Sequence, residues 1–306
     1  MLDTKILKVK KVKNGLYYFI GLIFLFLNKL RHTIFGYTTP RHYPITEFAR
    51  AIEYDFKIVE QWLDFLHKYS ENSSIEGKTV LELGPGADLG VGIILLMKNV
   101  KKYNAIDIND LVKSVPDKFY EILFDYIRNT HNNNEIIKFL RSQLQLTRLG
   151  KNDRLNYIYD KNFDLSILKN EDIDFVFSQA AFEHFDDVEK TISQLSEIVK
   201  PGTILISEID LKTHTRWIRD ADPLNIYRYS DFIYNLFKFS GSPNRIRPYE
   251  YETILKKNGW TKIEIFPLTV LDKEYLSKVQ NKLNKKFRDS KNQMNYLSIT
   301  ICATKK

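Results

Sequence analysis

The sequence predicts an α/β fold built on a doubly wound, mostly parallel β-sheet. Short apolar segments of strand length alternate along the 306 residues with longer segments whose apolar residues recur at helical spacing. This alternation is typical of a parallel sheet with helices on both faces. One predicted strand also runs directly into a Gly-Pro-Gly turn and a helix, in "VLELGPGADLG" (80–90). The length allows one large domain with additions.

Seven strands are expected in this sheet. The last two are joined by "LDKEYLSKVQNKLNKKF" (271–287), which is helical in pattern but strongly basic and has the character of an insertion. Two parallel strands need a crossover connection, usually a helix that packs on the sheet. We therefore expect the final strand to be antiparallel. The predicted strands are 79–84, 103–108, 155–160, 173–179, 203–210, 260–268 and 295–306.

Helices are predicted where apolar residues repeat at helical spacing. Residues 111–149 show this periodicity with a break at 129–134, so we interpret 111–150 as a helical insertion. "TPRHYP" (39–44) reads as a linker, because its two prolines resist regular structure. The main domain is therefore predicted over 45–306. Its other helices are predicted at 45–69, 89–99, 188–200 and 249–259.

Residues 1–44 are predicted to form a basic and apolar helical extension. Five lysines precede "LYYFIGLIFLFL" (16–27), and "NKLRH" follows it. Twelve helical residues rise about 18 Å, which is too short for a bilayer core of about 30 Å. A signal peptide is less favoured because no small-residue cleavage site follows. Two interpretations stay open, a helix in the membrane interface with contact through residues 8–37 and a helix packed on the domain.

The charge and the cysteine content limit the partners and the compartment. The net charge of +8 and the pI of about 9.2 favour anionic partners such as nucleic acid, acidic lipid or a phosphorylated substrate. The single cysteine, Cys302, excludes an internal disulfide and a cysteine-built zinc site. We expect it to be a buried thiol. These features are consistent with the cytoplasm, including the cytoplasmic face of a membrane.

The Gly-Pro-Gly turn is expected to bind a nucleotide-like cofactor. Gly84 and Gly86 let a ligand approach the backbone, and the helix that follows directs its N-terminal N–H groups at the ligand. The third glycine stands at Gly90, which displaces it from the dinucleotide pattern G-x-G-x-x-G. Glu82 would also oppose a diphosphate. Asp107 ends the second predicted strand, where a carboxylate can accept two ribose hydroxyls.

Four segments together resemble the class I S-adenosylmethionine-dependent methyltransferases. They are "LELGPG" (81–86), "AIDI" (105–108), "IDFVFSQAAFEHFDD" (173–187) and "EIVKPGTILISEID" (197–210). The resemblance covers about 75–268. It implies a Rossmann-like sheet whose last strand is the family's reversed seventh strand, and it implies S-adenosyl-L-methionine as the cofactor. Asp88 departs from the family pattern, since many members have a third glycine there.

The resemblance also implies the cofactor residues. Asp160 would bind the adenine amino group, although Asp153 and Asp164 compete for that role. Ser178 and Gln179 would lie near the sulfonium or the carboxylate. The alternative for the glycines and Asp107 is a plain turn and a surface acid. The full predicted set is Glu82, Gly84, Pro85, Gly86, Asp107, Ile108, Asp160, Ser178 and Gln179.

Base candidates are few, because the chain has only six histidines. His184 follows the fourth predicted strand and His214 follows the fifth, and either would serve a hydroxyl acceptor as catalytic base. The alternative is that each is held structurally by a neighbouring backbone group. A metal site of Glu183, His184 and Asp187 is possible but not favoured, so no metal is predicted.

The segment 211–250 is predicted to bind the acceptor, because it is rich in Tyr, Phe, Trp and Arg. Arg245 and Arg247, on alternate positions, would grip a phosphate or carboxylate, or else form surface salt bridges. "SEIDLKTH" (207–214) and "NRIRPYEYETILKKNGW" (244–260) carry a looser likeness to bacterial methyltransferases of surface-polysaccharide biosynthesis.

The predicted reaction is O-methylation of a glycan, a lipid-linked sugar or another small-molecule hydroxyl. An RNA methyltransferase is one rival, suggested by the high pI. Against nucleic acid as a partner, the chain has no Asn/Asp-Pro-Pro-Tyr/Phe motif after the fourth strand and no RNA-binding module. A nicotinamide-dependent oxidoreductase and a non-catalytic scaffold that binds S-adenosylmethionine are two further rivals. No oligomeric state is predicted.

Overall fold

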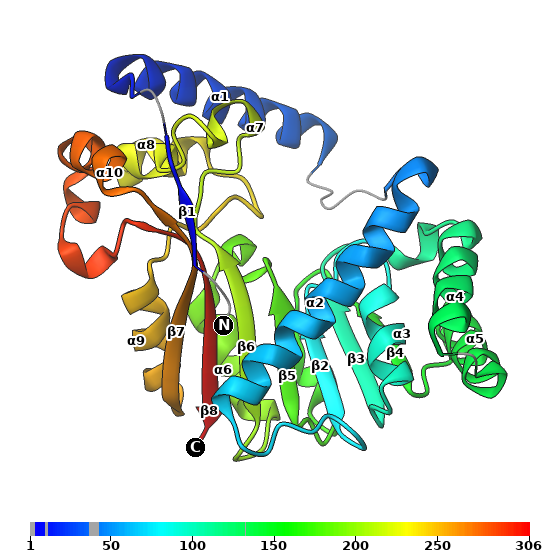
Figure 1. The fold of residues 1–306 in the computed structure, drawn as a ribbon. Helices are drawn as coiled ribbons and strands as arrows, with labels where there is room; N and C mark the ends of the chain where they lie inside the picture. The colour runs from blue at the N-terminus through cyan, green and yellow to red at the C-terminus, as the bar shows by residue number, and fades with distance from the viewer. Residues whose placement is uncertain (1–3, 10–11, 37–42, 132) are drawn as a thin grey trace. The chain divides into compact units, whose positions relative to one another are not determined.

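The computed structural model describes residues 4–9, 12–36, 43–131 and 133–306, and contains one eight-stranded sheet (Figure 1). The strand order is β1-β7-β8-β6-β5-β2-β3-β4. Seven strands were expected, so the prediction was one strand short. The additional strand, β1 (Lys5–Leu7), lies at the sheet edge, parallel to β7. Three residues inside a lysine-rich segment are too few to show the period-two pattern of a strand.

The seven predicted strands are all present. Four of them pair in parallel, β2 with β3 and β5, and β3 with β4. These strands are short and apolar, as expected for a sheet buried on both faces. Their bounds are β2 Thr79–Leu83, β3 Lys102–Asp107, β4 Leu155–Tyr159, β5 Phe175–Gln179, β6 Ile204–Asp210, β7 Trp260–Leu271 and β8 Tyr296–Lys305.

The final strand is antiparallel, which confirms the prediction. The N–H of Lys305, at the end of β8, donates to Thr203 O at 2.9 Å, just before β6 begins. The N–H of Leu211, just after β6 ends, donates to Leu297 O near the start of β8, at 2.8 Å. The two strands therefore run in opposite directions. β7 and β8 are likewise antiparallel.

The predicted helices are present within a few residues of their expected bounds. The segment 111–150 forms α4 and α5, which meet inside the predicted break. Asn133 caps α5, since its side chain accepts from the N–H groups of Glu135 and Ile136. The α-helices are α1 Asn14–Phe35, α2 Phe48–Tyr69, α3 Gly90–Met97, α4 Asp117–His131, α5 Asn134–Arg148, α6 Val188–Ile198, α7 Arg216–Arg219, α8 Asp231–Phe237, α9 Pro248–Lys257 and α10 Lys273–Val279.

The chain divides into two compact units. Unit 1 comprises 1–37, 180–192 and 207–301, and unit 2 comprises 38–179, 193–206 and 302–306. The predicted domain boundary at residue 44 stays a prediction, and most of the predicted linker 39–44 lies outside the described residues. Cys302 is a fully buried thiol in β8, as expected.

The core of unit 2 is built where α2 packs on β5. The apolar stripe of α2 includes Ile52, Val59, Trp62 and Leu66, all buried. The Trp62 indole stacks on the Phe177 ring, with centroids 4.7 Å apart and planes 8° from parallel. Aromatic pairs of this kind stabilise a core beyond the area that they bury. α2 thus packs against β5, the strand that ends in Gln179.

In unit 1, helix α1 docks with one face on the protein body (Figure 1). Tyr18, Leu22 and Leu25 pack against a buried cluster that includes Tyr229 and Tyr275. The docking also uses the helix backbone. Asn225 Nδ2 donates to Tyr17 O at 2.9 Å, and Tyr229 OH donates to Tyr18 O at 2.8 Å. The helix has 22 residues rather than the twelve of its apolar run.

Gly21 gives a test of this docking. A Cβ added there would lie 2.0 Å from Asn225 Oδ1 and 2.3 Å from Tyr229 OH, both held in the docking contact. We expect Gly21→Ala to destabilise unit 1 by about 1–3 kcal/mol. The measurements are thermal unfolding and the rate of tryptic cleavage within α1.

The matched control is Gly15→Ala on the same helix, where an added Cβ meets no atom within 4 Å. It should leave stability unchanged or raise it by less than about 1 kcal/mol, through helix propensity. Equal behaviour of the two variants would contradict the docking.

Candidate active site

The Gly-Pro-Gly turn of unit 2 adopts a conformation that requires glycine. Gly84 and Gly86 have φ angles of 72° and 83°, in the left-handed region that β-carbons disfavour. The N–H of Gly84 donates to Ile106 O at 3.0 Å, which holds the turn against β3. Pro85 lies half-buried between the two glycines. Helix α3 begins four residues after Gly86, so its N-terminus follows the turn as predicted.

Asp107, the last residue of β3, is tied to this turn. Its carboxylate accepts the N–H of Asn109 at 2.7 Å and also the N–H of Gly86. Burial raises the pKa of Asp107 to about 6, although these hydrogen bonds oppose the shift. The carboxylate is therefore ionised at neutral pH. Ile108, the next residue, is exposed.

Glu82 lies in β2, two residues before the turn, and is buried in the sheet. Its side chain is buried, and its Oε2 accepts a hydrogen bond from Tyr103 OH at 2.5 Å. Burial raises the pKa of Glu82 to about 8, so the carboxyl is largely protonated at neutral pH. This corrects the expectation of a cofactor-binding carboxylate. Glu82 is a positioning residue, because it presents neither surface nor charge to a ligand.

Asp88, which stands where many family members have a third glycine, binds the start of helix α3. Its Oδ1 accepts the N–H of Gly90 at 2.8 Å, at the start of α3, where a negative charge is favourable. Asp55 of α2 lies against the same place and is buried. Burial raises the pKa of both carboxyls, that of Asp88 to about 6; the charge of Asp88 and the hydrogen bond between the two side chains raise the pKa of Asp55 further, while the same hydrogen bond lowers that of Asp88. Asp55 was not predicted as a site residue, although it is an acid on the apolar stripe of α2.

The two residues predicted at the end of β5 differ in their exposure. Ser178 is fully buried, and its Oγ donates to Leu83 O at 3.0 Å, which joins β5 to the end of β2. It cannot touch a ligand, so its prediction as a cofactor contact is wrong. Gln179 is only half-buried, and its Oε1 is enclosed without a hydrogen-bond partner among the described residues. An orphaned amide oxygen of this kind is a natural acceptor for a donor group of a ligand.

Asp160 shapes the loop after β4. Its Oδ1 accepts the N–H groups of Asn162 and Asp164, each at 2.9 Å, and its own N–H donates to Asp107 O at 3.0 Å. This bond ties Asp160 to the ribose-binding candidate. The competitors are engaged elsewhere, Asp153 with Gln143 and Asp164 with the N–H of Ser166. The adenine role of Asp160 stays a prediction.

In unit 1, three ionisable side chains meet after β5 and β6. Glu183 and His184 belong to a short 3-10 helix, 182–184, and His214 follows β6. The His184 and His214 rings lie 4.8 Å apart between centroids, and His214 Nε2 is 3.9 Å from Glu183 Oε1. Glu183 is buried, and its Oε2 has no hydrogen-bond partner within the described ranges. The two predicted histidines are therefore neighbours.

Each histidine is oriented by a backbone carbonyl. His184 Nδ1 lies 2.6 Å from Gly241 O, and His214 Nδ1 lies 3.0 Å from Lys212 O. A carbonyl only accepts, so both Nδ1 atoms carry the proton and both Nε2 atoms are unprotonated in the neutral ring. Burial lowers the pKa of both histidines, that of His214 to about 4. Both rings are therefore neutral at physiological pH, as a base must be.

The same cluster is the set of described residues that could hold a metal ion. Glu183, His184 and His214 offer ligand atoms that all lie within 4.8 Å of one another. Asp187, which the sequence also offered as a ligand, lies outside the set and instead accepts the N–H of Lys190 at 2.9 Å, at the start of α6. The expectation of no metal stays a prediction.

The two arginines predicted to grip an acceptor are occupied. Arg247 is fully buried, and its guanidinium donates to Asn292 O, Gln293 O, Tyr296 O and Tyr227 OH. Arg245 is buried too, and it donates to Ile226 O, Tyr229 O and the carboxylate of Asp231. Their guanidinium groups are thus satisfied within the protein. The prediction that they bind substrate is therefore wrong.

The tyrosines of 211–250 are also structural. Tyr227, Tyr229 and Tyr234 are buried in the core of unit 1. The segment is held by a buried ion pair, in which Arg228 donates to both oxygens of Asp222 at 2.7 and 2.8 Å. These aromatic faces are therefore not available to a sugar ring, contrary to expectation.

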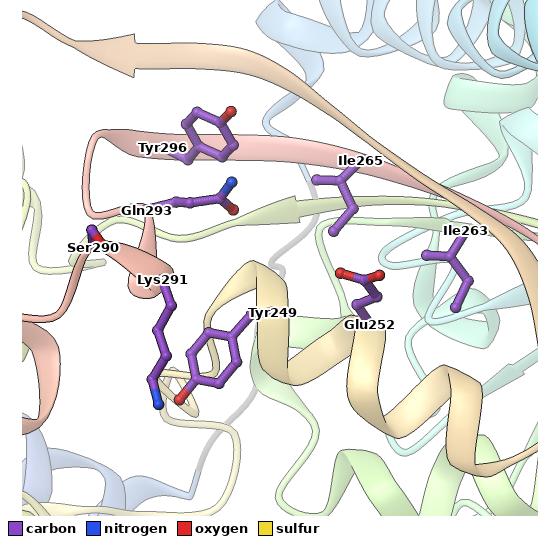
Figure 2. Close-up of a pocket in the computed structure, with 8 residues that line it drawn as sticks. All are labelled: Tyr249, Glu252, Ile263, Ile265, Ser290, Lys291, Gln293 and Tyr296. Atoms are coloured by element: carbon purple, nitrogen blue, oxygen red, sulfur yellow. The ribbon is translucent and has the colours of Figure 1, made fainter.

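A hollow elsewhere in unit 1 lies between α9, β7 and the start of β8 (Figure 2). Glu252 and Tyr249 of α9 face it, with Lys291 Nζ 5.0 Å from the centre of the Tyr249 ring. No residue predicted to bind cofactor or to catalyse lines it. We therefore place no part of a reaction there.

The residues of unit 2 fit S-adenosylmethionine. The glycine turn lets the ligand approach the backbone closely, and the ionised Asp107 can accept hydrogen bonds from the ribose hydroxyls. Gln179 Oε1 can accept a hydrogen bond from a donor group of the ligand. Binding should therefore depend on the charge of Asp107. We expect the dissociation constant of S-adenosylmethionine to rise roughly tenfold from pH 7 to pH 5, as protonation removes the acceptor. Calorimetric titration at each pH measures it.

The Asp107→Asn variant separates this charge from the other acids. It should bind weakly and with little dependence on pH, whereas Asp125→Asn on exposed α4 should behave as the wild type. Wild-type affinity in Asp107→Asn would contradict the assignment of the ribose site.

Comparison with known proteins gives the family. Residues 52–265 match the family model described as "Methyltransferase domain". A sequence search of curated proteins gave no match. Solved structures similar to the chain include a putative S-adenosylmethionine-dependent methyltransferase from Listeria monocytogenes, at 16% identity, covering 82% of this chain and 98% of that one, with a TM-score of 0.43. A putative O-methyltransferase from Nostoc punctiforme has 13% identity, covers 95% and 72%, and has a TM-score of 0.46.

The family match spans the strands that carry Gly84, Gly86 and Asp107, and it extends through His184 and His214 into β7. The chain therefore belongs to the methyltransferase-domain family, as an S-adenosylmethionine-dependent methyltransferase.

Proposed function

We propose that this enzyme methylates a hydroxyl oxygen of a glycan or a lipid-linked sugar, at the cytoplasmic face of a membrane. The observation that carries the proposal is the neutral histidine pair beside Glu183. A neutral amine can attack with its lone pair before it loses a proton, whereas a hydroxyl must give up a proton of high pKa as it attacks, so an oxygen acceptor needs a base. The polysaccharide-related likeness of 207–214 and 244–260 supports a sugar.

His214 is the proposed base. Its Nδ1 is fixed by Lys212 O, which directs the lone pair of Nε2 away from that carbonyl. The acceptor hydroxyl donates its proton to Nε2 as its oxygen attacks, and the charge of Asp210 favours the imidazolium that forms. His184 packs edge-on against the ring and keeps it in place. When bound, S-adenosylmethionine supplies the electrophilic methyl group.

The acceptor class can be tested with methyl-labelled S-adenosylmethionine. The probes are a lipid-linked glycan fraction and a total RNA fraction from the source cells. We expect label in the glycan fraction, in an alkali-stable ether that methanolysis releases as an O-methyl sugar. Nuclease-sensitive label in RNA would instead establish an RNA methyltransferase, and an alkali-labile product would indicate a carboxyl acceptor.

His214→Gln tests the base. It should lower kcat by at least about a hundredfold and leave the affinity for S-adenosylmethionine unchanged, because His214 belongs to unit 1 and the cofactor residues to unit 2. In the wild type, kcat should stay level down to about pH 5, because the pKa of His214 is about 4. A variant that retains wild-type kcat would rule His214 out as the base.

Chelation separates a base from a metal site in the same cluster. If His214 acts as a base, dialysis against EDTA should leave kcat unchanged. Loss of activity on chelation, with recovery on adding Mg²⁺ or Zn²⁺, would show instead that Glu183, His184 and His214 hold a metal ion.

A further inference from the structure

The outward face of α1 is a continuous apolar stripe. At 100° per residue its exposed side chains recur at i, i+3, i+4 and i+7, so they fall on one side of the helix. Phe19 is 65% exposed and Ile23 57%. The docked residues Tyr18, Leu22 and Leu25 fall on the opposite side. The stripe consists of Leu16, Phe19, Ile23, Phe26, Leu27, Leu30 and Ile34.

Two neighbouring helices of unit 1 add to this surface. Phe26 packs edge-on against Phe237 of α8, and Asn28 Nδ2 donates to Thr215 Oγ1 just before α7 at 3.4 Å, so both helices lie beside α1 (Figure 1). α8 exposes Phe232 and Leu236, and Trp217 of α7 is 84% exposed. A soluble monomer rarely leaves so many large apolar side chains together in water.

Basic residues lie on the elements around the stripe. Lys13 and Arg31 are exposed at the two ends of α1. Asn14 Nδ2 donates to Lys278 O of α10 at 3.0 Å, which links α1 to the basic segment 273–291. That segment carries seven Lys and Arg against two acids and packs on the same buried cluster as α1 through Val279, Leu283 and Phe287.

We propose that this surface binds an anionic lipid bilayer, with α1 lying along the membrane plane. The stripe would enter the boundary between headgroups and acyl chains, and the lysines would meet acidic headgroups. A second copy of the chain fits less well, because a self-complementary contact would bring the basic segments of both copies together. The inference deepens the proposed membrane location and does not rest on the proposed reaction.

A bilayer-spanning orientation of α1 fits the docking contacts less well. Within the described residues, α1 is the helix long and apolar enough to cross a membrane. Its inner face, however, is hydrogen-bonded to Asn225 and Tyr229, and Lys29 Nζ donates to Lys238 O at 2.7 Å. Spanning would break these contacts, whereas lying in the interface keeps them.

The chain carries its own fluorescent reporter for the test. Of its three tryptophans, Trp62 and Trp260 are buried, so Trp217 alone meets solvent. Vesicles of phosphatidylcholine with phosphatidylglycerol should shift its emission to the blue and float the full-length protein in a sucrose gradient. Pure phosphatidylcholine vesicles should bind it much more weakly, and added salt should weaken the anionic binding.

Variants identify the surface. Phe19→Ser, Ile23→Ser and Leu30→Ser together should weaken vesicle partitioning by at least about a hundredfold. Lys282→Gln and Lys285→Gln should each weaken binding to anionic vesicles about fivefold. The matched control, Leu149→Ser with Ile167→Ser, removes equally exposed apolar side chains from unit 2 and should change nothing. Unchanged thermal unfolding verifies folding in every variant, because the stripe and the basic segment belong to unit 1 whereas the cofactor residues belong to unit 2.

Three results would overturn the proposal. Protein that stays bound to vesicles through an alkaline carbonate wash would show that α1 is inserted across the bilayer. A dimer that the triple-serine variant converts to a monomer, without vesicle binding by the wild type, would make a second copy the occupant. Failure of the folded, monodisperse wild type to bind any vesicle would exclude a lipid surface.

Discussion

The candidate cofactor site depends on the carboxylate of Asp107 accepting backbone N–H groups. It receives Gly86 N–H from the turn after β2 and Asn109 N–H from the turn after β3. One side chain thus joins the turn after β2 to the turn after β3. Gly84 can then hold its left-handed conformation against β3. Without that ion the turn would lose the anchor that keeps its backbone open to a ligand.

The cost of this arrangement is a cluster of three buried acids, Glu82, Asp55 and Asp107, with the half-buried Asp88 beside them. Glu82, Asp88, Asp55 and Asp107 all lie beneath or beside the turn, and burial raises the pKa of each. The protein manages them differently. Tyr103 donates to Glu82, the N-terminus of α3 faces Asp88, and burial together with the charge of Asp88 raises the pKa of Asp55. Asp107 is therefore the acid best supplied with backbone donors that favour its charge.

The sequence predicted correctly those features that depend on residues close together in the chain. The strands β2 to β8, the antiparallel direction of β8 and the glycine turn could be predicted, because alternation and turn chemistry act over a few residues. Ser178, Arg245 and Arg247 were misjudged for the opposite reason. Their partners lie far along the chain, as with Leu83 for Ser178 and Asn292 for Arg247, and no local pattern reveals them. β1 was not predicted, because its partner β7 lies more than 260 residues away in the chain.

Helix α1 is held in a way that separates its two faces. Asn225 and Tyr229 donate to main-chain carbonyls of α1, and Gly21 permits their close approach. Much of the docking therefore depends on the helix backbone rather than on its side chains. Few of the outward side chains take part in it. Substitutions on that face can therefore accumulate without loss of the fold. Relatives that share this docking can change the outward side chains of α1 to suit a different contact surface, while the catalytic framework stays the same.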